Sequence, residues 1–414
     1  MPVKKNIILI TPGQPALNPR LVKEADALAD AGYNVTVFYA YWNSWGYTFS
    51  KNLLLKKKWK AICVGGNPFD KRITYFISRI VYKIARFIVK KLGPINYFAE
   101  LSASRSSFFL LRTIKKHKAD LYIAHYLGAL APAIKAAKTH HAKWGFDAED
   151  FHRQEITDDS NSFNFKLAKY LEDKYLDKVD YVTVSSPQIA DTYKKIYPAI
   201  IPVTILNVFP INDDILEPRC NTTGPVKLFW VSQTIGSNRG IDVLINALQL
   251  LNDMHFELHL LGYVTAEDKH LFVQAMHLAT GSSIHFHEPI LPDGLIAFAS
   301  QFDIGLALEP GFCLNNDLAL SNKIFIYLQA GLAIIASNTT AQQGFIKENP
   351  DVGKIYTQKD IHALADILWT YHTNRELLSK TCKASLMLRQ RLNWENESIK
   401  FLSLINKTLN KIEP

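Results

Sequence analysis

Two basic residues in the second half of the chain, Lys323 and Arg239, could bind an anion. Asn322 and Lys323 follow Ser321 at the start of a predicted helix that ends before Gly331. The free backbone N–H groups and the dipole at such a helix start favour an anion. Upstream, Arg239 lies in a polar loop, and its guanidinium can donate a forked pair of hydrogen bonds to phosphate. The pattern predicts a diphosphate site, although each residue alone would also fit a helix cap or a surface loop.

A histidine and three carboxylates in the first half could contact hydroxyl groups or carry protons. His125 ends the apolar run DLYIAH, and Asp147, Glu149 and Asp150 lie together in FDAED. The alternatives are a structural histidine at a strand end and a helix cap with solvated neighbours. No Ser-His-Asp order, Walker loop, metal-ligand spacing or convincing Asp-x-Asp motif stands out, so we expect no metal and no cofactor.

Short apolar runs alternate with amphipathic stretches along the whole chain, which predicts parallel strands covered by helices on both faces. The runs in the first half are 6–10, 34–40, 120–125, 180–185 and 202–206. Those in the second half are 227–232, 256–262, 284–288, 303–308 and 332–337. The polar stretch 207–224 separates the two series. A length of 414 residues also suits two domains. We therefore predict an α/β protein of two Rossmann-like, doubly wound domains, with ligands at the carboxyl ends of the strands.

Several segments resemble the family 4 glycosyltransferases, which are retaining enzymes of GT-B fold, and they occur in the family's order. The C-terminal half carries the more specific matches, which are FWVSQTIGSNRGIDVLINAL, FELHLLG, HFHEPILPDGLIAFASQFDIGLAL and SNKIFIYLQAGLAIIAS. Looser matches are ILITPGQPALNPRLVKEADALADAGYNVTVF, DLYIAHYLGALAPA, YLEDKYLDKVDYVTVSS, ILNVFP and LNWENESIKFLSLINKTL. The resemblance covers nearly the whole chain except roughly residues 45–100.

The resemblance implies two domains that face each other across a cleft. It assigns 1–206 to an acceptor-binding domain, 207–224 to a linker, 225–390 to a nucleotide-sugar-binding domain and 391–414 to a helix that returns to the first domain. It implies a metal-independent, retaining hexosyltransferase that moves sugar from a nucleotide diphosphate sugar to a glycan or lipid-linked acceptor. Such a reaction would belong to the synthesis of surface polysaccharide or glycoconjugates.

The resemblance also assigns roles to single residues. The residues expected to bind the donor are Gln233, Arg239, Gly262, Ser321, Asn322 and Lys323. Those expected to bind the acceptor are Gly13, Arg20, Asp147, Glu149 and Asp150. The catalytic candidates are His125 and Glu309. The loop that holds Arg239 carries one basic residue fewer than is usual in the family, and Gln233 can only form a hydrogen bond there.

Two positions depart further from the family. Ile326 and Leu318 stand where many members have glutamates that contact the donor sugar and the ribose. Glu309, in the sequence Glu-Pro-Gly-Phe, resembles the start of the family's motif, and we predict that it reaches the donor's sugar instead. The alternative is that Glu309 caps a turn at the end of its strand.

Three other functions share this architecture. A nucleotide-sugar 2-epimerase of GT-B fold would act without an acceptor, and an inactive relative would bind the nucleotide sugar only. A two-lobed exported binding protein should carry a signal peptide, and the N-terminal apolar run, IILI, is too short for one.

The charge of the chain is concentrated in one block. The net charge is +9, yet residues 51–91 hold twelve Lys or Arg and the single acid Asp70. Because the rest is close to neutral, we expect a local docking surface for an anionic membrane and no nucleic acid partner. The four scattered cysteines and the lack of a long apolar run predict a cytoplasmic protein. The basic block adds the expectation of a peripheral location at the inner face of the cell membrane.

Overall fold

The computed structural model describes residues 4–215, 217–218 and 223–410. The chain divides into two compact units. Unit 1 comprises Met1–Leu206, Cys313–Asn315 and Ser398–Pro414, and unit 2 comprises Asn207–Phe312 and Asn316–Glu397. Part of the predicted linker, at 216 and 219–222 with Cys220, lies outside the described residues, as does the end of the predicted last helix, at 411–414. Among the described cysteines, Cys63, Cys313 and Cys382 are not joined in a disulfide.

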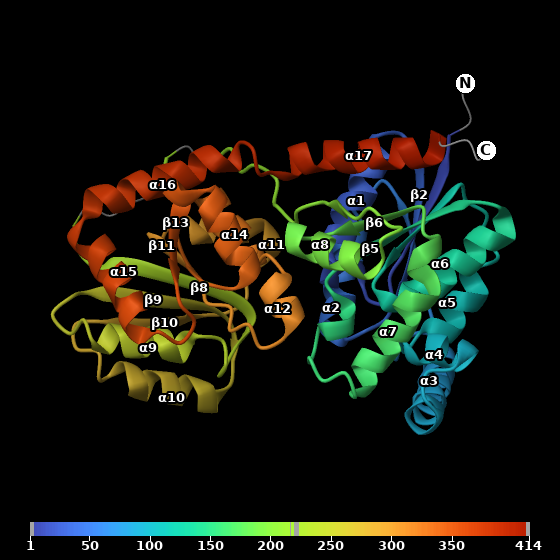
Figure 1. The fold of residues 1–414 in the computed structure, drawn as a ribbon, viewed down its shortest axis with the longest axis horizontal. Coiled ribbons are helices and arrows are strands. Elements are labelled where there is room, and N and C mark those ends of the chain that lie inside the picture. The colour runs from blue at the N-terminus through green and yellow to red at the C-terminus, as the bar shows by residue number, and fades with distance from the viewer. Residues whose placement is uncertain (1–3, 216, 219–222, 411–414) are drawn as a thin grey trace. The chain divides into compact units, whose positions relative to one another are not determined.

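Unit 1 contains a seven-stranded sheet in the order β3-β2-β1-β4-β5-β6-β7, and every described pairing is parallel (Figure 1). Its strands are β1 Asn6–Ile10, β2 Asn34–Ala40, β3 Lys60–Val64, β4 Leu121–His125, β5 Lys143–Glu149, β6 Tyr181–Val184 and β7 Val203–Thr204. Its helices are α1 Pro19–Asp30, α2 Ser44–Leu54, α3 Arg72–Leu92, α4 Asn96–Ser102, α5 Ser107–Ile114, α6 Leu127–His140, α7 Phe163–Tyr175 and α8 Pro187–Ile196. Short 3-10 turns cover Pro15–Leu17, His152–Gln154 and Leu176–Lys178.

Unit 2 contains a six-stranded parallel sheet in the order β10-β9-β8-β11-β12-β13. Its strands are β8 Val226–Ile235, β9 Phe256–Val264, β10 Ser283–His287, β11 Ile304–Ala307, β12 Ala333–Ser337 and β13 Gly353–Tyr356. Its helices are α9 Ile241–Gln249, α10 Ala266–Met276, α11 Pro292–Ala299, α13 Asn322–Ala330, α14 Thr340–Glu348, α15 Ile361–Thr373 and α16 Arg375–Arg389, with a 3-10 turn at Pro350–Val352. Helices α12 Leu314–Leu318 and α17 Trp394–Asn410 contain residues of both units.

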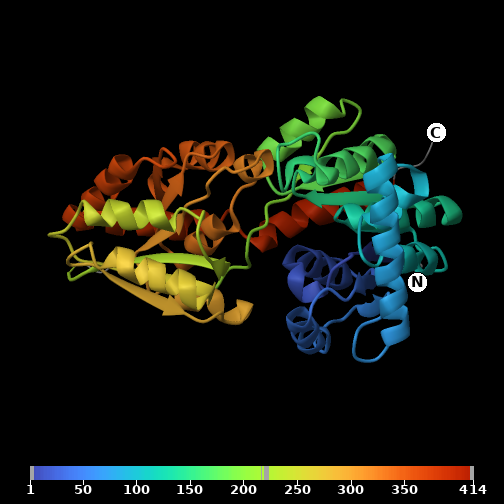
Figure 2. The same cartoon turned by 90° about the horizontal axis from the view of Figure 1, so that it is seen from below.

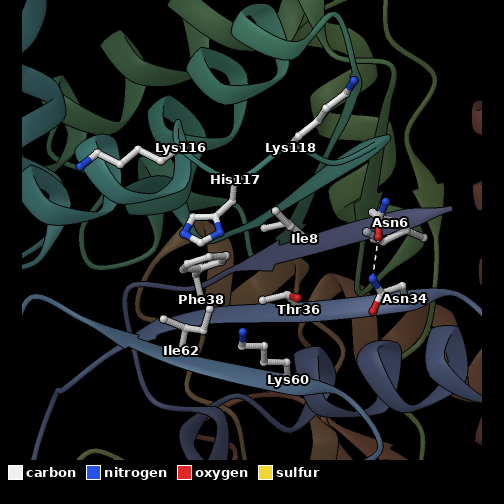
Figure 3. Close-up of a pocket in the computed structure, with 11 residues that line it drawn as sticks. Asn6, Ile8, Asn34, Thr36, Phe38, Lys60, Ile62, Lys116, His117 and Lys118 are labelled. Atoms are coloured by element: carbon white, nitrogen blue, oxygen red, sulfur yellow. Dashed lines mark hydrogen bonds between the residues drawn. The ribbon is translucent and has the colours of Figure 1, made fainter.

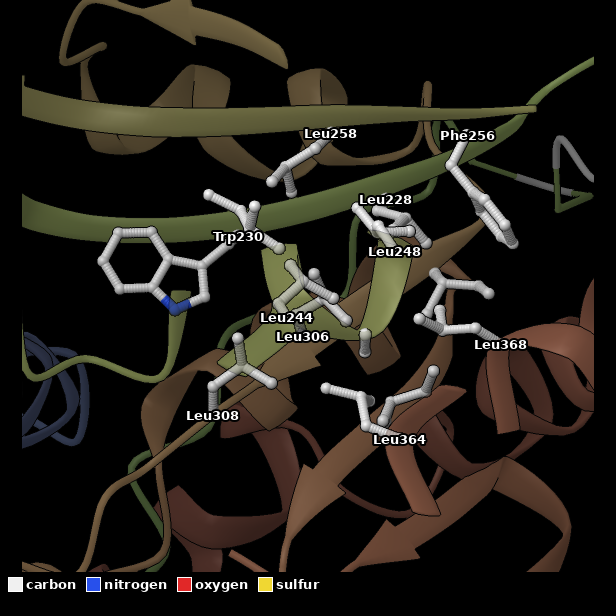
Figure 4. Close-up of a cluster of buried hydrophobic side chains, with 14 of the residues drawn as sticks. Leu228, Trp230, Leu244, Leu248, Phe256, Leu258, Leu306, Leu308, Leu364 and Leu368 are labelled. Carbon is white, nitrogen blue, oxygen red and sulfur yellow. The ribbon is translucent and has the colours of Figure 1, made fainter. Parts of the chain in front are cut away.

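The sheet of unit 2 is covered on both faces, as its apolar strands require. Alternate residues of a strand point to opposite faces. Leu228 and Trp230 therefore join a buried cluster with α9 and α15 (Figure 4). Phe229, between them, stacks on Phe302 and meets the ring of Tyr327 from α13. The central strands β11 and β12 are buried along their whole length, which explains why they lack a polar alternation.

The ten predicted strands are all present, so the prediction of an α/β fold with two parallel sheets is confirmed. Three strands were not predicted. They are β3, β5 and β13, with the short sequences KAICV, KWGFDAE and GKIY, each of which begins with a charged residue or a glycine. Within the described residues, no helix combines the length and apolar character that crossing a bilayer would require.

Candidate functional site

Each sheet has one point where the strand order reverses, and the sequence candidates gather there. In unit 1, β1 is followed in the chain by β2 and β3 on one side, and β4 then lies on its other side. In unit 2, β8 and β11 are related in the same way. The loops that leave neighbouring strands at such a point run in opposite directions and leave room for a ligand. The residues that follow β1, β4, β8 and β11 are therefore the first candidates for binding.

Glu309 is the centre of the polar cluster in unit 2. It follows β11, and its Oε1 accepts hydrogen bonds from Lys323 Nζ at 2.5 Å and from Ser321 Oγ at 2.7 Å. Asn316 Nδ2 lies 3.5 Å from Oε2. Burial would raise the pKa of Glu309, but Lys323 together with Ser321 and Asn316 holds this pKa below its usual range. The carboxylate is thus ionised and keeps the lysine in place.

The backbone of Glu309 is also anchored. Its carbonyl oxygen accepts hydrogen bonds from Ser337 Oγ at 2.6 Å and Gln358 Nε2 at 3.2 Å. These donors come from the end of β12 and from the segment after β13, so two neighbouring strands fix the residue after β11. The alternative that Glu309 merely caps a turn does not account for the three side chains that converge on its carboxylate.

The start of α13 differs from an ordinary capped helix. Ser321 precedes the helix, yet its side chain does not cap it, because the hydroxyl donates to Glu309 instead. Asn322 and Lys323 form the first turn, and Lys323 Nζ also lies 5.5 Å from the centre of the Trp230 ring. The N–H group of Ile324 already donates to the Ser321 carbonyl oxygen at 3.1 Å. The two N–H groups before it, those of Asn322 and Lys323, are of the kind that can bind an anion.

The loop after β8 approaches the same end of the sheet. Gly240, which precedes α9, has φ +78°, and a Cβ there would lie 2.7 Å from both Cβ and O of Leu308. Only glycine permits this contact. It brings the neighbouring Arg239 close to the residue before Glu309. Arg239 is exposed, with its guanidinium 3.4 Å from Ser232 Oγ and 3.3 Å from Thr234 Oγ1.

Two further donor candidates lie near this loop. Gln233 is exposed on β8, beside an irregularity in the pairing of β8 with β9 between Val231 and Thr234. Gly262 lies opposite on β9, where a Cβ would come within 2.3 Å of the Ser232 carbonyl oxygen. Ile326 and Leu318, which stand where the sequence resemblance would place two glutamates, are buried apolar residues. Donor binding by the six predicted residues stays a prediction, although the structure brings Ser321, Lys323 and Glu309 into direct contact.

The polar cluster of unit 1 is a buried network of charges. Arg20 on α1 donates from Nε to Asp147 Oδ2 at 2.8 Å and from Nη1 to the Ile205 carbonyl at 2.5 Å. His125, at the end of β4, lies between two carboxylates, with Nδ1 3.1 Å from Asp147 and Nε2 3.3 Å from Glu24. The four ionisable side chains are at most 1% exposed.

In this network, the effect of burial on the pKa of each group is opposed or reinforced by the neighbouring charges. Burial would lower the pKa of His125, but Glu24 and Asp147 raise it to about 9, so the imidazole is charged at neutral pH. Burial would raise the pKa of Asp147, but Arg20 and His125 hold it below its usual range. Burial and the neighbouring Asp147 raise the pKa of Glu24. The sequence interpretation missed Glu24, although its place four residues after Arg20 puts both on one helix face.

The geometry of this network raises the question of a metal. One ligand atom each from Glu24, His125 and Asp147 lies within 4.8 Å of the others. Arg20 already supplies positive charge there, since its Nε is 2.8 Å from Asp147 and 3.6 Å from Glu24. A cation would have to displace this guanidinium. We interpret the cluster as an ion-pair network that fixes His125 and Asp147 at the end of the sheet.

The carboxylates of Glu149, the last residue of β5, and Asp150, which follows it, are less enclosed. Glu149 has φ +52°, uncommon for a residue with a side chain, at an irregularity in the pairing of β5 with β6. Burial, then Asp150 and Asp147, raise the pKa of Glu149 to about 7. Asp150 Oδ1 accepts a hydrogen bond from Asn315 Nδ2 at 2.9 Å.

Glu149 and Asp150 keep some exposed surface, whereas Arg20 and Asp147 are buried. Gly13, in the loop after β1, is half-buried and accepts from Ala40 N at 3.1 Å. Contact of these five residues with an acceptor stays a prediction, as does catalysis by His125.

One pocket in unit 1 lies away from all of these residues. Its volume is about 260 Å³, and its lining includes Lys60, Phe38 and His117 (Figure 3). Asn6, Asn34 and Lys60 begin their strands, so the pocket lies toward the amino ends of the sheet, where doubly wound folds rarely bind ligands. Lys116 and Lys118 point away from each other in Figure 3 and do not converge on a common ligand.

No protein-family model and no curated protein sequence matches the chain. Solved structures do. A glycosyltransferase from Rickettsia africae has 16% sequence identity and a TM-score of 0.67, over 99% of this chain and 100% of its own. Sucrose-phosphate synthase from Thermosynechococcus elongatus has 16% identity and a TM-score of 0.68, over 98% and 99%. TarM from S. aureus, solved with UDP, alpha-GlcNAc-glycerol and Fondaparinux, has 12% identity and a TM-score of 0.69, over 99% and 100%. The chain has the fold of the GT-B glycosyltransferases. Its place in family 4 stays a prediction.

Proposed function

We propose that this protein is a glycosyltransferase that takes a sugar from a nucleotide diphosphate sugar. The observation that carries the proposal is the cluster of Glu309, Ser321 and Lys323, which lies beside the point where the strand order of unit 2 reverses. In a GT-B fold this is where a nucleotide diphosphate would meet a helix start and a lysine. Similar structures have been solved with such ligands, among them HepE from Anabaena with UDP and glucose (14% identity, TM-score 0.67, over 97% of this chain and 100% of its own).

Transfer of the sugar would be favoured by fixed positive charge beside the leaving diphosphate. Breaking the bond between sugar and phosphate leaves negative charge on the departing diphosphate, and preorganised donors aimed there lower the barrier. In the proposed complex Lys323 binds the diphosphate with the first N–H groups of α13, and Arg239 approaches from the exposed loop after β8. Glu309 holds Lys323 in position and accepts a hydrogen bond from the donor's sugar.

We also propose that the transfer needs no metal and retains the anomeric configuration. Lys323, Arg239 and the start of α13 would supply the charge that a metal supplies in other transferases. Retention through a covalent intermediate would need a carboxylate close to the anomeric carbon. The proposed role of Glu309 as a partner of Lys323 leaves it stabilised as an anion and a poor nucleophile. A front-face transfer, in which the departing phosphate accepts the proton of the acceptor hydroxyl, suits this arrangement better.

We further propose that unit 1 binds the acceptor and that the sugar transfer takes place at a membrane surface. Glu149 and Asp150 would bind hydroxyl groups of a glycan or lipid-linked acceptor, while Arg20 and Asp147 position His125. A peripheral location at the inner face of the cell membrane fits a lipid-linked acceptor and the basic block at 51–91. The product would enter surface polysaccharide or glycoconjugate.

The test is a transfer assay with the whole chain. UDP-, GDP- and ADP-hexoses are each incubated with short glycans and with polyprenyl-phosphate-linked sugars, with and without EDTA. NMR should show a new glycosidic bond with the anomeric configuration of the donor, at a rate that EDTA leaves unchanged. An inverted product, a loss of activity with EDTA, or an epimerised nucleotide sugar in the absence of acceptor would each reject part of the proposal.

A further inference from the structure

Helix α3, Arg72–Leu92, is attached to unit 1 by a narrow face of small residues. Its buried positions are Ser78, Ala85 and Val89, and it packs against α4 and α5. Ser78 Oγ also donates a hydrogen bond to the Gly65 carbonyl at 3.0 Å. Small side chains on the buried face allow a close approach, and they leave the larger apolar side chains of the helix for another face.

The large apolar side chains of α3 form a stripe that faces solvent. Their steps of three, one, three, four and three residues place them on one face of a helix. The stripe consists of Ile73, Phe76, Ile77, Ile80, Ile84 and Phe87, each between 41% and 79% exposed. An amphipathic helix of a globular protein normally turns such a stripe toward the core. In unit 1, α3 runs along the outside of the fold as a long blue helix (Figure 2). A contiguous exposed apolar patch of this kind marks an interaction surface.

A second, basic stripe lies next to the apolar one. Its residues follow at steps of seven, four, three and four and are Arg72, Arg79, Lys83, Arg86 and Lys90. The helix contains no acidic residue. The guanidinium of Arg79 lies 4.5 Å from the centre of the Tyr75 ring and that of Arg86 4.2 Å from that of Phe163. Among the described contacts no carboxylate is paired with either arginine, so no ion pair offsets their positive charge.

We propose that α3 lies in the plane of an anionic phospholipid bilayer. The apolar stripe, Ile73 to Phe87, enters the boundary between headgroups and acyl chains, and the basic stripe binds the phosphates of the headgroups beside it. The face of Ser78, Ala85 and Val89 remains on the protein. The inference specifies the membrane contact of the proposed function, and its test does not depend on sugar transfer.

Charge and shape favour a lipid surface over other occupants. Two copies of α3 placed face to face would bring two helices without any acid together, and their charges would repel. Nucleic acid would satisfy the basic stripe but leave the isoleucines and phenylalanines in water. A bilayer of anionic lipid satisfies both stripes, and each Lys or Arg near its surface contributes about 1 kcal/mol.

The experiment is vesicle flotation of the whole chain. Vesicles of phosphatidylcholine alone are compared with vesicles that also contain phosphatidylglycerol, at low and at high salt. The protein should float with the anionic vesicles, and binding should weaken at least tenfold with neutral ones. High salt should weaken binding to anionic vesicles without abolishing it, since salt screens the basic stripe but not the apolar one.

Paired variants separate the two stripes. Ile80→Glu with Ile84→Glu should abolish flotation at either salt concentration. The matched control is Leu271→Glu with Leu278→Glu, which places the same charges at exposed apolar positions of unit 2 and should float like the wild type. Lys83→Gln with Lys90→Gln should float less at low salt only, whereas Lys347→Gln with Lys354→Gln, at exposed positions of unit 2, should have no effect.

Several outcomes would overturn the inference. It fails if the wild type floats with neither vesicle, or if the Ile80, Ile84 variant floats as its control does. It also fails if sedimentation shows a dimer that this variant abolishes while the vesicles bind nothing, because α3 would then be a self-association surface. Circular dichroism and nucleotide binding of each variant establish that it is folded. Flotation without sugar transfer would retain this inference and reject the proposed activity.

Discussion

Replacing Arg20 by methionine tests whether the charges of unit 1 form one interdependent network. Methionine keeps much of the side-chain volume and removes the charge and the donors. The change takes away the hydrogen bonds to Asp147 Oδ2 and to the Ile205 carbonyl, and the ion pair with Glu24. Asp147 and Glu24 then remain in a buried site where His125 lies beside both of them.

The cost follows from burial. Removing one partner of a buried ion pair costs about 3–5 kcal/mol, because the remaining charge is neither paired nor hydrated. Thr183 Oγ1 still donates to Asp147 at 2.8 Å and His125 remains beside it, which places the expected loss near the lower end, about 3 kcal/mol. Adding Asp147→Asn removes the stranded charge. The double variant should therefore lose less stability than the sum of the two single variants.

The assay is urea unfolding at pH 7, followed by far-UV circular dichroism and by tryptophan fluorescence. The control is Lys58→Met, since Lys58 forms an ion pair of similar length with Asp30, at 2.7 Å, but both side chains are exposed. Exposed pairs contribute little to stability. Equal and small losses for Arg20→Met and Lys58→Met would refute the argument from burial. Additive losses for Arg20→Met and Asp147→Asn would show that the two residues do not act as one network.

Three further predictions concern the candidate site and its pH dependence. Lys323→Ala and Arg239→Ala should each weaken donor use about tenfold to a hundredfold, since a hydrogen bond to a charged group contributes about 1.5–3 kcal/mol, whereas Lys347→Ala should not. Glu309→Gln should reduce transfer strongly, and a wild-type turnover would end its proposed role at the donor's sugar. Because the pKa of His125 is raised to about 9, its stabilising contribution is complete below pH 6.5 and is lost as the pH rises through 9. The unfolding free energy should fall by about 1–3 kcal/mol across this range, and His125→Asn should flatten that dependence.

Most of the fold could be predicted because buried parallel strands leave a strong apolar signal. Strands such as NIILI and NVTVFYA coincide with β1 and β2 residue for residue. The strand β5 was missed because its sequence, KWGFDAE, begins and ends with charged residues. The segment FDAED at the end of β5 contains carboxylates that lie near Arg20 in unit 1. Apolar periodicity thus fails as a signal where a strand ends in charged residues.

The site was only partly predictable, because its partners come from distant parts of the sequence. The position of Ser321 suggested a helix cap, and only the structure shows its hydroxyl on Glu309, twelve residues upstream. Asn316, which also contacts Glu309, carried no signal at all. On α3 the periodicity of the basic residues was visible in the sequence. The exposure of the apolar stripe to solvent could not be predicted from the sequence, because periodicity alone does not show which face of a helix is buried.

The most direct test of the central claim is a calorimetric titration of the whole chain with UDP, GDP and ADP and with their hexose conjugates, repeated on Lys323→Ala. The account predicts that one nucleotide diphosphate and its sugar conjugate bind at a single site. It further predicts that Lys323→Ala weakens this binding about tenfold to a hundredfold while leaving the fold intact. If none of the nucleotides binds to the wild type, or if Lys323→Ala binds them as tightly as the wild type does, the assignment of a nucleotide-sugar site to the Glu309, Ser321 and Lys323 cluster is contradicted.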